Sequence, residues 1–213
     1  MARLLLVRHG VTEFNSTRRF AGHSDIEMSA AGYRQVEKLR DRLASEKIDA
    51  VYSSDLKRAL VTAKIVTSKH NVDIVTCPEL REINYGQAEG LTFEEIRRLY
   101  PDVAELITNF NLKLKFPGGE SFIEFIERTN KFLARLEQHA PSQTILIVSH
   151  SGPLRVLVCR YCQCDNGGDS KIRPVSSLLK RLPQAGWSSV GVGENSIHHC
   201  PATDNRHKHQ GCQ

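Results

Sequence analysis

Histidines and arginines follow apolar runs at three widely separated points of this sequence. Arg8 and His9 come directly after "LLLV", His150 follows "TILIVS", and Arg58 lies shortly after a third apolar run. Guanidinium groups bind phosphate oxygens in a bidentate manner, and a neutral imidazole can act as a nucleophile. If these four side chains meet in space, they could hold a phosphoryl group and accept it.

Phosphoryl transfer needs stabilisation of charge on the phosphoryl oxygens, a nucleophile and a proton donor for the leaving oxygen. The sequence contains no P-loop, DxD cluster or HExxH motif, so we predict no metal site and no cofactor. His9 then remains as the candidate nucleophile. Glu82, within "ELREINYG", is the candidate general acid and base.

The elements that would carry these residues alternate along the chain. Short runs rich in β-branched residues predict strands at 3–7, 48–52, 72–75 and 144–148. Apolar residues at helical spacing predict helices between these strands, and the alternation predicts an α/β fold. We expect a three-layer α/β/α sandwich with a mostly parallel central sheet and a small helical cap. The predicted helical faces are Gly32, Val36, Leu39 and Leu43 with Ser29 as N-cap, a helix at 56–68, and Phe122, Ile126, Thr129, Leu133 and Leu136.

The carboxyl ends of parallel strands lie at one edge of a sheet, where ligands of such folds bind. Arg8 and His9 leave the first predicted strand there, and His150 leaves the last one. Arg58 follows the second strand, in the first turn of the next helix. Each residue alone has an ordinary structural explanation, such as a solvated histidine or a surface arginine. Because all of them are predicted to lie at one edge of the sheet, a functional site is favoured over these separate structural explanations.

Five blocks of this sequence resemble, in order, the motifs of the histidine phosphatase superfamily, the phosphoglycerate-mutase-like proteins. The resemblance covers about residues 2–158 and predicts an enzyme, a phosphoric monoester hydrolase. It implies that His9 becomes phosphorylated, that Glu82 donates the proton, and that phosphate is bound by Arg8, Arg58, His150 and Asn15. The blocks are "LLLVRHGVTEFN", "YSSDLKRALVTA", "ELREINYGQAEG", "PGGESF" and "VSHSGPLR".

Within that superfamily, "GHSDIEMSAAG", "PGGESF" and "SHSGPLRVLVC" most resemble the α-ribazole phosphatases. The resemblance implies removal of the 5′-phosphate of α-ribazole 5′-phosphate during cobalamin biosynthesis. The mutases of the superfamily generally carry a longer insertion before the "PGG" block, whereas here two short helices are predicted, at 92–100 and 103–110. A phosphoglycerate mutase, a broad-specificity sugar-phosphate phosphatase and a non-catalytic phospho-ligand-binding protein remain alternatives.

Composition and charge limit the other classes of function. With 40% hydrophobic and 25% charged residues, the chain has an ordinary globular composition. The net charge of +5 comes without a basic stripe, so we expect no nucleic-acid partner. No apolar run is long enough to span a membrane, and the N-terminus does not resemble a signal peptide. We expect a cytoplasmic protein that acts on a small-molecule phosphate ester and could form a homodimer.

The predicted domain organisation has two parts. Residues 1–160 form the phosphatase core, with a cap insertion at about 84–120. Residues 161–213 form an atypical C-terminal segment that we expect to be partly disordered, because its end is polar and without periodicity. Natural divergence and a shifted reading frame are both open explanations for it. Its cysteines and histidines lack paired C-x-x-C knuckles, so we favour no zinc site there over a structural one.

Overall fold

The chain folds around a sheet with the strand order β3-β2-β4-β1-β5. A computed structural model describes residues 2–109, 111–161 and 198–199. The first four strands pair in parallel, and β5 pairs antiparallel with β1. This result confirms the α/β fold with a mostly parallel sheet. The strands are β1 (Arg3–Arg8), β2 (Ala50–Ser53), β3 (Ile74–Thr76), β4 (Thr144–Ser149) and β5 (His198–His199).

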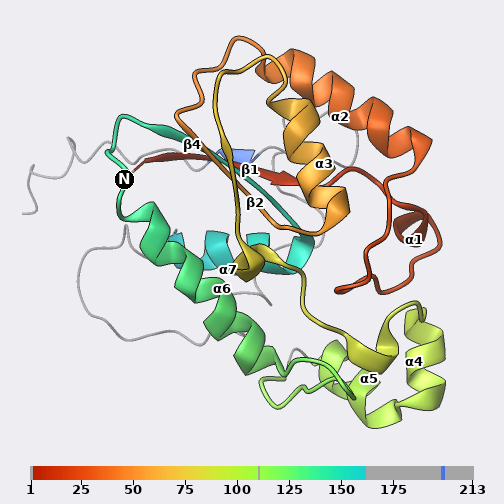
Figure 1. Cartoon of the computed structure of the whole chain (residues 1–213). Helices are drawn as coiled ribbons and strands as arrows, with labels where there is room; N and C mark the ends of the chain where they lie inside the picture. Colours follow the sequence, from red (N-terminus) through yellow and green to blue (C-terminus); the bar gives the residue numbers. More distant parts are fainter. Residues whose placement is uncertain (1, 110, 162–197, 200–213) are drawn as a thin grey trace, which may run out of the picture.

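Helices cover both faces of the sheet, as a three-layer sandwich requires. Helices α2 and α3 lie on one face, and α6 and α7 lie on the other (Figure 1). The predicted sandwich is therefore confirmed. The helices are α1 (Glu13–Ser16), α2 (Ala30–Leu43), α3 (Lys57–Val66), α4 (Phe93–Leu99), α5 (Pro101–Thr108), α6 (Phe122–Leu136) and α7 (Ser151–Tyr161), with 3-10 turns η1 (Pro78–Leu80) and η2 (Gly86–Ala88).

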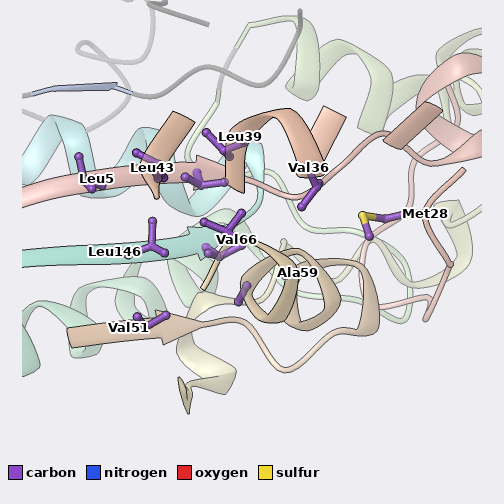
Figure 2. Close-up of a cluster of buried hydrophobic side chains, with 12 residues drawn as sticks. Leu5, Met28, Val36, Leu39, Leu43, Val51, Ala59, Val66 and Leu146 are labelled. Atoms are coloured by element: carbon purple, nitrogen blue, oxygen red, sulfur yellow. The ribbon is translucent and has the colours of Figure 1, made fainter. Parts of the chain in front are cut away.

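Strand β1 is buried on both faces, which explains its uninterrupted apolar run. Leu5 and Val7 pack against α2 and α3, whereas the alternate residues Leu4 and Leu6 pack against α6 and α7. Figure 2 shows the first of these clusters, with Leu5 among the buried side chains of both helices. Each fully buried aliphatic side chain contributes about 1.5–3 kcal/mol. The two clusters therefore hold the strand, and the polar residues at its end, in a fixed place.

Helix α2 forms as predicted. The Ser29 hydroxyl accepts a hydrogen bond from the backbone N–H of Gly32 at 3.1 Å and so caps the first turn. Gly32, Val36, Leu39 and Leu43 form its buried face. Helix α3 begins one residue later than predicted, and it ends at Val66.

Two strands and one helical face differ from the prediction in detail. Strand β2 begins two residues later than predicted, because its pairing with β4 starts at Ala50. Strand β3 also begins two residues late, because its pairing with β2 starts at Ile74. In α6, Phe125 and Phe132 are buried while Phe122 and Leu133 are only half-buried. The reason is that α6 packs against the sheet near its end and against the cap near its start, so its apolar face is broader than one stripe.

The segment we call the cap, residues 84–120, carries the two predicted short helices. Thr92 and Glu95 form a capping box at the start of α4, and Pro101 occupies the first turn of α5. The cap packs its apolar side chains onto α6, and Figure 1 shows α4 and α5 near the start of that helix, away from the sheet. The cap therefore has a small core of its own, beside the edge where β1 and β4 end.

The predictions for residues 161–213 fall almost entirely outside the described residues. Partial disorder, a shifted reading frame and metal binding by the late cysteines and histidines all concern that segment and stay predictions. Its described part is Tyr161, at the end of α7, and strand β5, which pairs with Leu5 and Leu6 of β1. Among the described helices, none has the length and apolar character needed to cross a membrane.

Candidate active site

Strands β1 and β4 bring His9 and His150 together. Arg8 pairs with Ser149 in the parallel register, and the backbone N–H of His9 donates to the Ser149 carbonyl at 3.0 Å. The two histidines follow this pair directly, and the centroids of their rings lie 5.0 Å apart. Both side chains are buried. The predicted meeting of these residues at the carboxyl edge of the sheet is what the structure shows.

His9 is held as a neutral imidazole with one free nitrogen. Its Nδ1 lies 2.8 Å from the Gly10 carbonyl oxygen, which can only accept, so Nδ1 carries the proton. Burial, followed by the charges of Arg8 and Arg58, lowers the pKa of His9 to about 3. At neutral pH the ring is therefore uncharged and its Nε2 keeps a lone pair, as a nucleophile requires.

Arg58 is a buried cation that donates to backbone carbonyls. Its Nη1 and Nη2 donate to the carbonyls of Ser24 and Gly22, both at 2.7 Å, and the side chain is almost fully buried. Its Nε is buried and has no hydrogen-bond partner among the described residues. A buried guanidinium stays charged and normally pairs with an anion. The site therefore has a cation and a free donor for an anionic ligand.

His150 adds a second buried nitrogen without a partner. Its Nε2 lies 2.9 Å from the Ser54 hydroxyl, whereas its Nδ1 has no partner within the described part of the chain. Burial, with the nearby His9 and Arg58, holds the pKa of His150 well below its usual value. If the Ser54 hydroxyl donates to Nε2, Nδ1 carries the proton and can donate it to a bound oxygen.

Glu82 reaches the site from the segment between η1 and η2. Its carboxylate accepts hydrogen bonds from the backbone N–H of Ile83, at 3.1 Å, and of Gly152, at 3.2 Å. Gly152 belongs to the first turn of α7, directly after His150. Glu82 is buried, with 8% of the residue exposed. This position beside the first turn of α7 suits a group that passes a proton to a departing oxygen.

Arg8 precedes His9 in the chain, and Asn15 lies in the short helix α1. Arg8 ends β1 half-buried, and its charge is the second cause of the lowered pKa of His9. The Asn15 Oδ1 accepts from both the N–H and the hydroxyl of Thr12 at 3.0 Å, which fixes the side chain of Asn15 at the start of α1. Its amide NH2 is the donor end left for a ligand.

Three further residues contact this group, and the sequence indicated no role for them. Ser54 contacts His150, Gly152 donates to Glu82, and the His23 Nε2 donates to the Glu82 carbonyl at 2.9 Å. Burial, ahead of the other causes, lowers the pKa of His23. Ser54 and Gly152 lie inside blocks that carry the family resemblance, and His23 lies inside "GHSDIEMSAAG". The order of those motifs was the only available signal, because each contact joins residues far apart in the sequence.

A pocket of about 240 Å³ opens beside Glu82, between the cap and α7. Its polar lining side chains are those of Glu82, Ser151 and Arg155, apart from the hydroxyl of Tyr85. Glu82 is the candidate site residue that also lines this pocket, so the pocket adjoins the site at Glu82. Its remaining walls are apolar, aromatic or glycine: Phe20, Ile83, Tyr85, Ile107, Leu114, Phe116, Phe122, Phe125, Gly152 and Val156.

Within residues 2–109, 111–161 and 198–199, no group of three or more histidine, cysteine, aspartate or glutamate side chains is arranged to hold a metal ion. The buried side chains at the site carry two imidazoles, a guanidinium and a carboxyl group: His9, His150, Arg58 and Glu82.

Comparison with known proteins identifies the same family. The histidine phosphatase superfamily (branch 1) matches residues 4–188. The adenosylcobalamin/α-ribazole phosphatase of Escherichia coli is 34% identical over 90% of this chain and 91% of its own length. Phosphoserine phosphatase 1 of Hydrogenobacter thermophilus is 33% identical over 78% of each chain. The structure of the α-ribazole phosphatase from Shigella flexneri is 30% identical, covers 84% of each chain and superposes with a TM-score of 0.73. The chain belongs to the histidine phosphatase superfamily, and it is a phosphatase.

Proposed function

We propose that this phosphatase removes the 5′-phosphate of α-ribazole 5′-phosphate, in cobalamin biosynthesis, through a phosphohistidine at His9. The observation that carries the proposal is the pocket beside Glu82, whose walls are mostly apolar and aromatic. The leaving alcohol of this substrate is a nucleoside with an aromatic, methylated base. Such a base gains free energy when it leaves water for an apolar pocket. The likeness to α-ribazole phosphatases over most of the chain supports the same substrate.

The first chemical step forms the phosphoenzyme. The Nε2 of His9 attacks phosphorus in line with the leaving O5′, while Nδ1 stays hydrogen-bonded to the Gly10 carbonyl. The phosphorus–O5′ bond breaks as Glu82, protonated at this stage, gives its proton to O5′. The phosphate-binding residues proposed to stabilise the equatorial oxygens are Arg8, Arg58, His150 and Asn15.

The second step restores the enzyme. The Glu82 carboxylate takes a proton from a water molecule that attacks phosphorus on the side that the nucleoside has left. The bond between phosphorus and the His9 Nε2 breaks, and inorganic phosphate departs. Glu82 is then protonated and His9 neutral, so the cycle can begin again.

A panel of phosphate esters tests the substrate. We expect the highest kcat/KM for α-ribazole 5′-phosphate, above phosphoserine, sugar phosphates and 3-phosphoglycerate. Turnover of 3-phosphoglycerate to 2-phosphoglycerate would instead identify a mutase, and binding of esters without turnover would identify a phospho-ligand-binding protein. A preference for any other ester would refute the proposed substrate.

A pair of cap variants tests the pocket itself. Ile107→Asn places an amide in the half-buried apolar wall, and Leu99→Asn is its control on the exposed surface of α4. We expect Ile107→Asn to raise KM for α-ribazole 5′-phosphate about 10-fold, since one lost apolar contact costs about 1–3 kcal/mol. Inhibition by inorganic phosphate should not change, because Ile107 is not one of the proposed phosphate-binding residues. Equal effects of the two variants would contradict the pocket assignment.

Phosphoserine is the second candidate substrate. Arg155 is an exposed residue of the pocket lining, where it could bind the carboxylate of phosphoserine. The likeness to a phosphoserine phosphatase also supports phosphoserine as a candidate substrate. Arg155→Gln separates the two candidates, because it should reduce kcat/KM for phosphoserine much more than for α-ribazole 5′-phosphate.

A cytoplasmic location and homodimer formation also stay proposals. Both described cysteines, Cys77 and Cys159, are free thiols, which agrees with a reducing compartment. Light scattering would test the dimer, which requires a mass of two chains. A fluorescent fusion in the source cell would test the location.

A further inference from the structure

Glu82 lies on a segment that has no regular secondary structure of its own. The segment runs from η1 to η2, so ladder hydrogen bonds do not set its path. Its position must come from contacts with other parts of the chain. General acid catalysis needs the carboxyl group within hydrogen-bond reach of the leaving oxygen, and small displacements there are costly. The groups that hold this segment therefore bear on catalysis.

Arg128, in the middle of α6, holds the backbone on which Glu82 lies. Its Nη1 donates to the carbonyls of Glu79, at 2.9 Å, and of Arg81, at 3.0 Å. Its Nη2 donates to the carbonyl of Glu82 itself at 3.1 Å. A fourth and longer contact, at 3.3 Å, reaches the Pro78 carbonyl. One planar guanidinium thus binds four backbone carbonyls of the stretch that leads to Glu82.

Glu120, from the "PGGESF" motif, orients that guanidinium. Arg128 Nε and Nη2 donate to its two carboxylate oxygens at 2.7 and 2.9 Å. Both side chains are 19% exposed, so the pair is mostly shielded from water. The same carboxylate accepts from the backbone N–H of Asn84 at 2.9 Å. Arg128 therefore binds the backbone before Glu82, and Glu120 binds the backbone after it.

The glycine before Glu120 allows this close approach. A Cβ atom on Gly119 would overlap the Asn84 carbonyl oxygen and crowd the Gly86 nitrogen. The backbone N–H of Glu120 donates to that same Asn84 carbonyl at 2.9 Å. The "PGGESF" motif, whose chemistry the sequence left unassigned, thus places a carboxylate next to the acid-bearing segment.

We propose that Arg128, oriented by Glu120, is a positioning residue that sets the place of the Glu82 carboxyl group for proton transfer. Arg128 does not contact the phosphate-binding groups, and it acts through the backbone of Glu82. The inference rests on the proposed role of Glu82 as general acid and base. A purely structural role would instead lower stability and all activities alike, and the experiment separates these two cases.

Two aryl esters of different leaving ability provide the readout. Phenol is a poorer leaving group than p-nitrophenol, so phenyl phosphate depends more on the general acid. Arg128→Lys keeps the charge but cannot span a carboxylate and three carbonyls. We expect it to reduce kcat/KM about 10-fold for phenyl phosphate and less than about 3-fold for p-nitrophenyl phosphate, because a general acid contributes about 10²–10⁴-fold in all.

Two further variants accompany this measurement. Arg135→Lys is the matched control, because Arg135 lies on the same helix and pairs with the Glu79 side chain, not with the backbone of Glu82. It should leave both rates within about 2-fold. Glu120→Gln keeps the side-chain shape and an acceptor for Asn84, so it gives a milder displacement if Arg128→Lys does not fold. It should show the same difference between the two esters.

The deciding measurement combines Arg128→Lys with Glu82→Gln. If Arg128 acts through Glu82, its replacement should cost less than about 2-fold for phenyl phosphate once the carboxyl group is gone. The same fold-loss in both backgrounds, or equal losses for both esters, would overturn the positioning role. If Glu82→Gln alone does not distinguish the two esters, the proposed acid is wrong, and that failure is visible separately.

Discussion

The backbone N–H of Gly152 donates to the Glu82 carboxylate at 3.2 Å, and there is no room for a side chain between them. A Cβ atom on Gly152 would overlap the Oε1 of Glu82. The first turn of α7 follows His150 directly and also packs against the Glu82 carboxyl group. A glycine is required by this contact and not by an unusual backbone angle.

Gly152→Ala should push the Glu82 carboxyl group out of place while the fold is kept. The overlapping atom is the end of a flexible side chain, so the carboxylate can move at low cost. We expect kcat/KM for phenyl phosphate to fall about 10-fold or more, and for p-nitrophenyl phosphate clearly less, as partial loss of a general acid requires. Steady-state kinetics on both esters checks this, and wild-type rates for phenyl phosphate would contradict it.

Arg58→Lys should nearly abolish turnover. The guanidinium spans the Gly22 and Ser24 carbonyls and still has a free Nε, whereas one ammonium cannot reproduce that fork. We expect kcat to fall on the order of 10²–10³-fold, the effect of losing one preorganised donor to the transition state. Arg34→Lys, at an exposed position of α2, is the control. Comparable rates for the two variants would place Arg58 outside the site.

Ser54→Ala should impair catalysis through His150. The Ser54 hydroxyl is the hydrogen-bond partner of the His150 Nε2, at 2.9 Å, and its loss leaves a buried nitrogen unpaired. We expect a loss of about 1–3 kcal/mol in the free energy of unfolding and a clear fall in kcat. Ser53→Ala is the matched control, because Ser53 is equally buried but its hydroxyl donates to a backbone carbonyl. If both variants keep equal activity, Ser54 does not orient the ring.

Acid should destabilise the fold through His9. Its pKa is about 3 in the folded protein and near the ordinary 6.5 in the unfolded chain. Between these values only the unfolded chain takes up the proton, so stability falls as the pH drops below about 6.5. His9 alone should cost about 2 kcal/mol on going from pH 8 to pH 5.

Urea unfolding at the two pH values measures that difference. His9→Gln removes the titrating ring, so the variant should show about 2 kcal/mol less loss of stability between pH 8 and pH 5. An unchanged difference between the two pH values would mean that His9 already accepts a proton in the folded protein.

Much of the fold follows from local patterns. Uninterrupted apolar residues predicted the doubly buried β1, and helical spacing predicted the buried face of α2, because burial repeats with the period of each element. The meeting of Arg8, His9, Arg58 and His150 also followed, since parallel strands end at one edge. The broader face of α6 did not follow, because it depends on the cap that packs against its first turns.

The sequence by itself thus determined the four parallel strands and the main helices between them, and which polar residues lie where the strands end. Only the tertiary structure decided how Glu82 is held, because its partners come from other elements: Gly152 from α7, Arg128 from α6 and His23 from the segment before α2. No spacing rule links these residues. Their contacts exist because packing of the sheet, α6 and the cap brings buried polar groups close enough to satisfy one another.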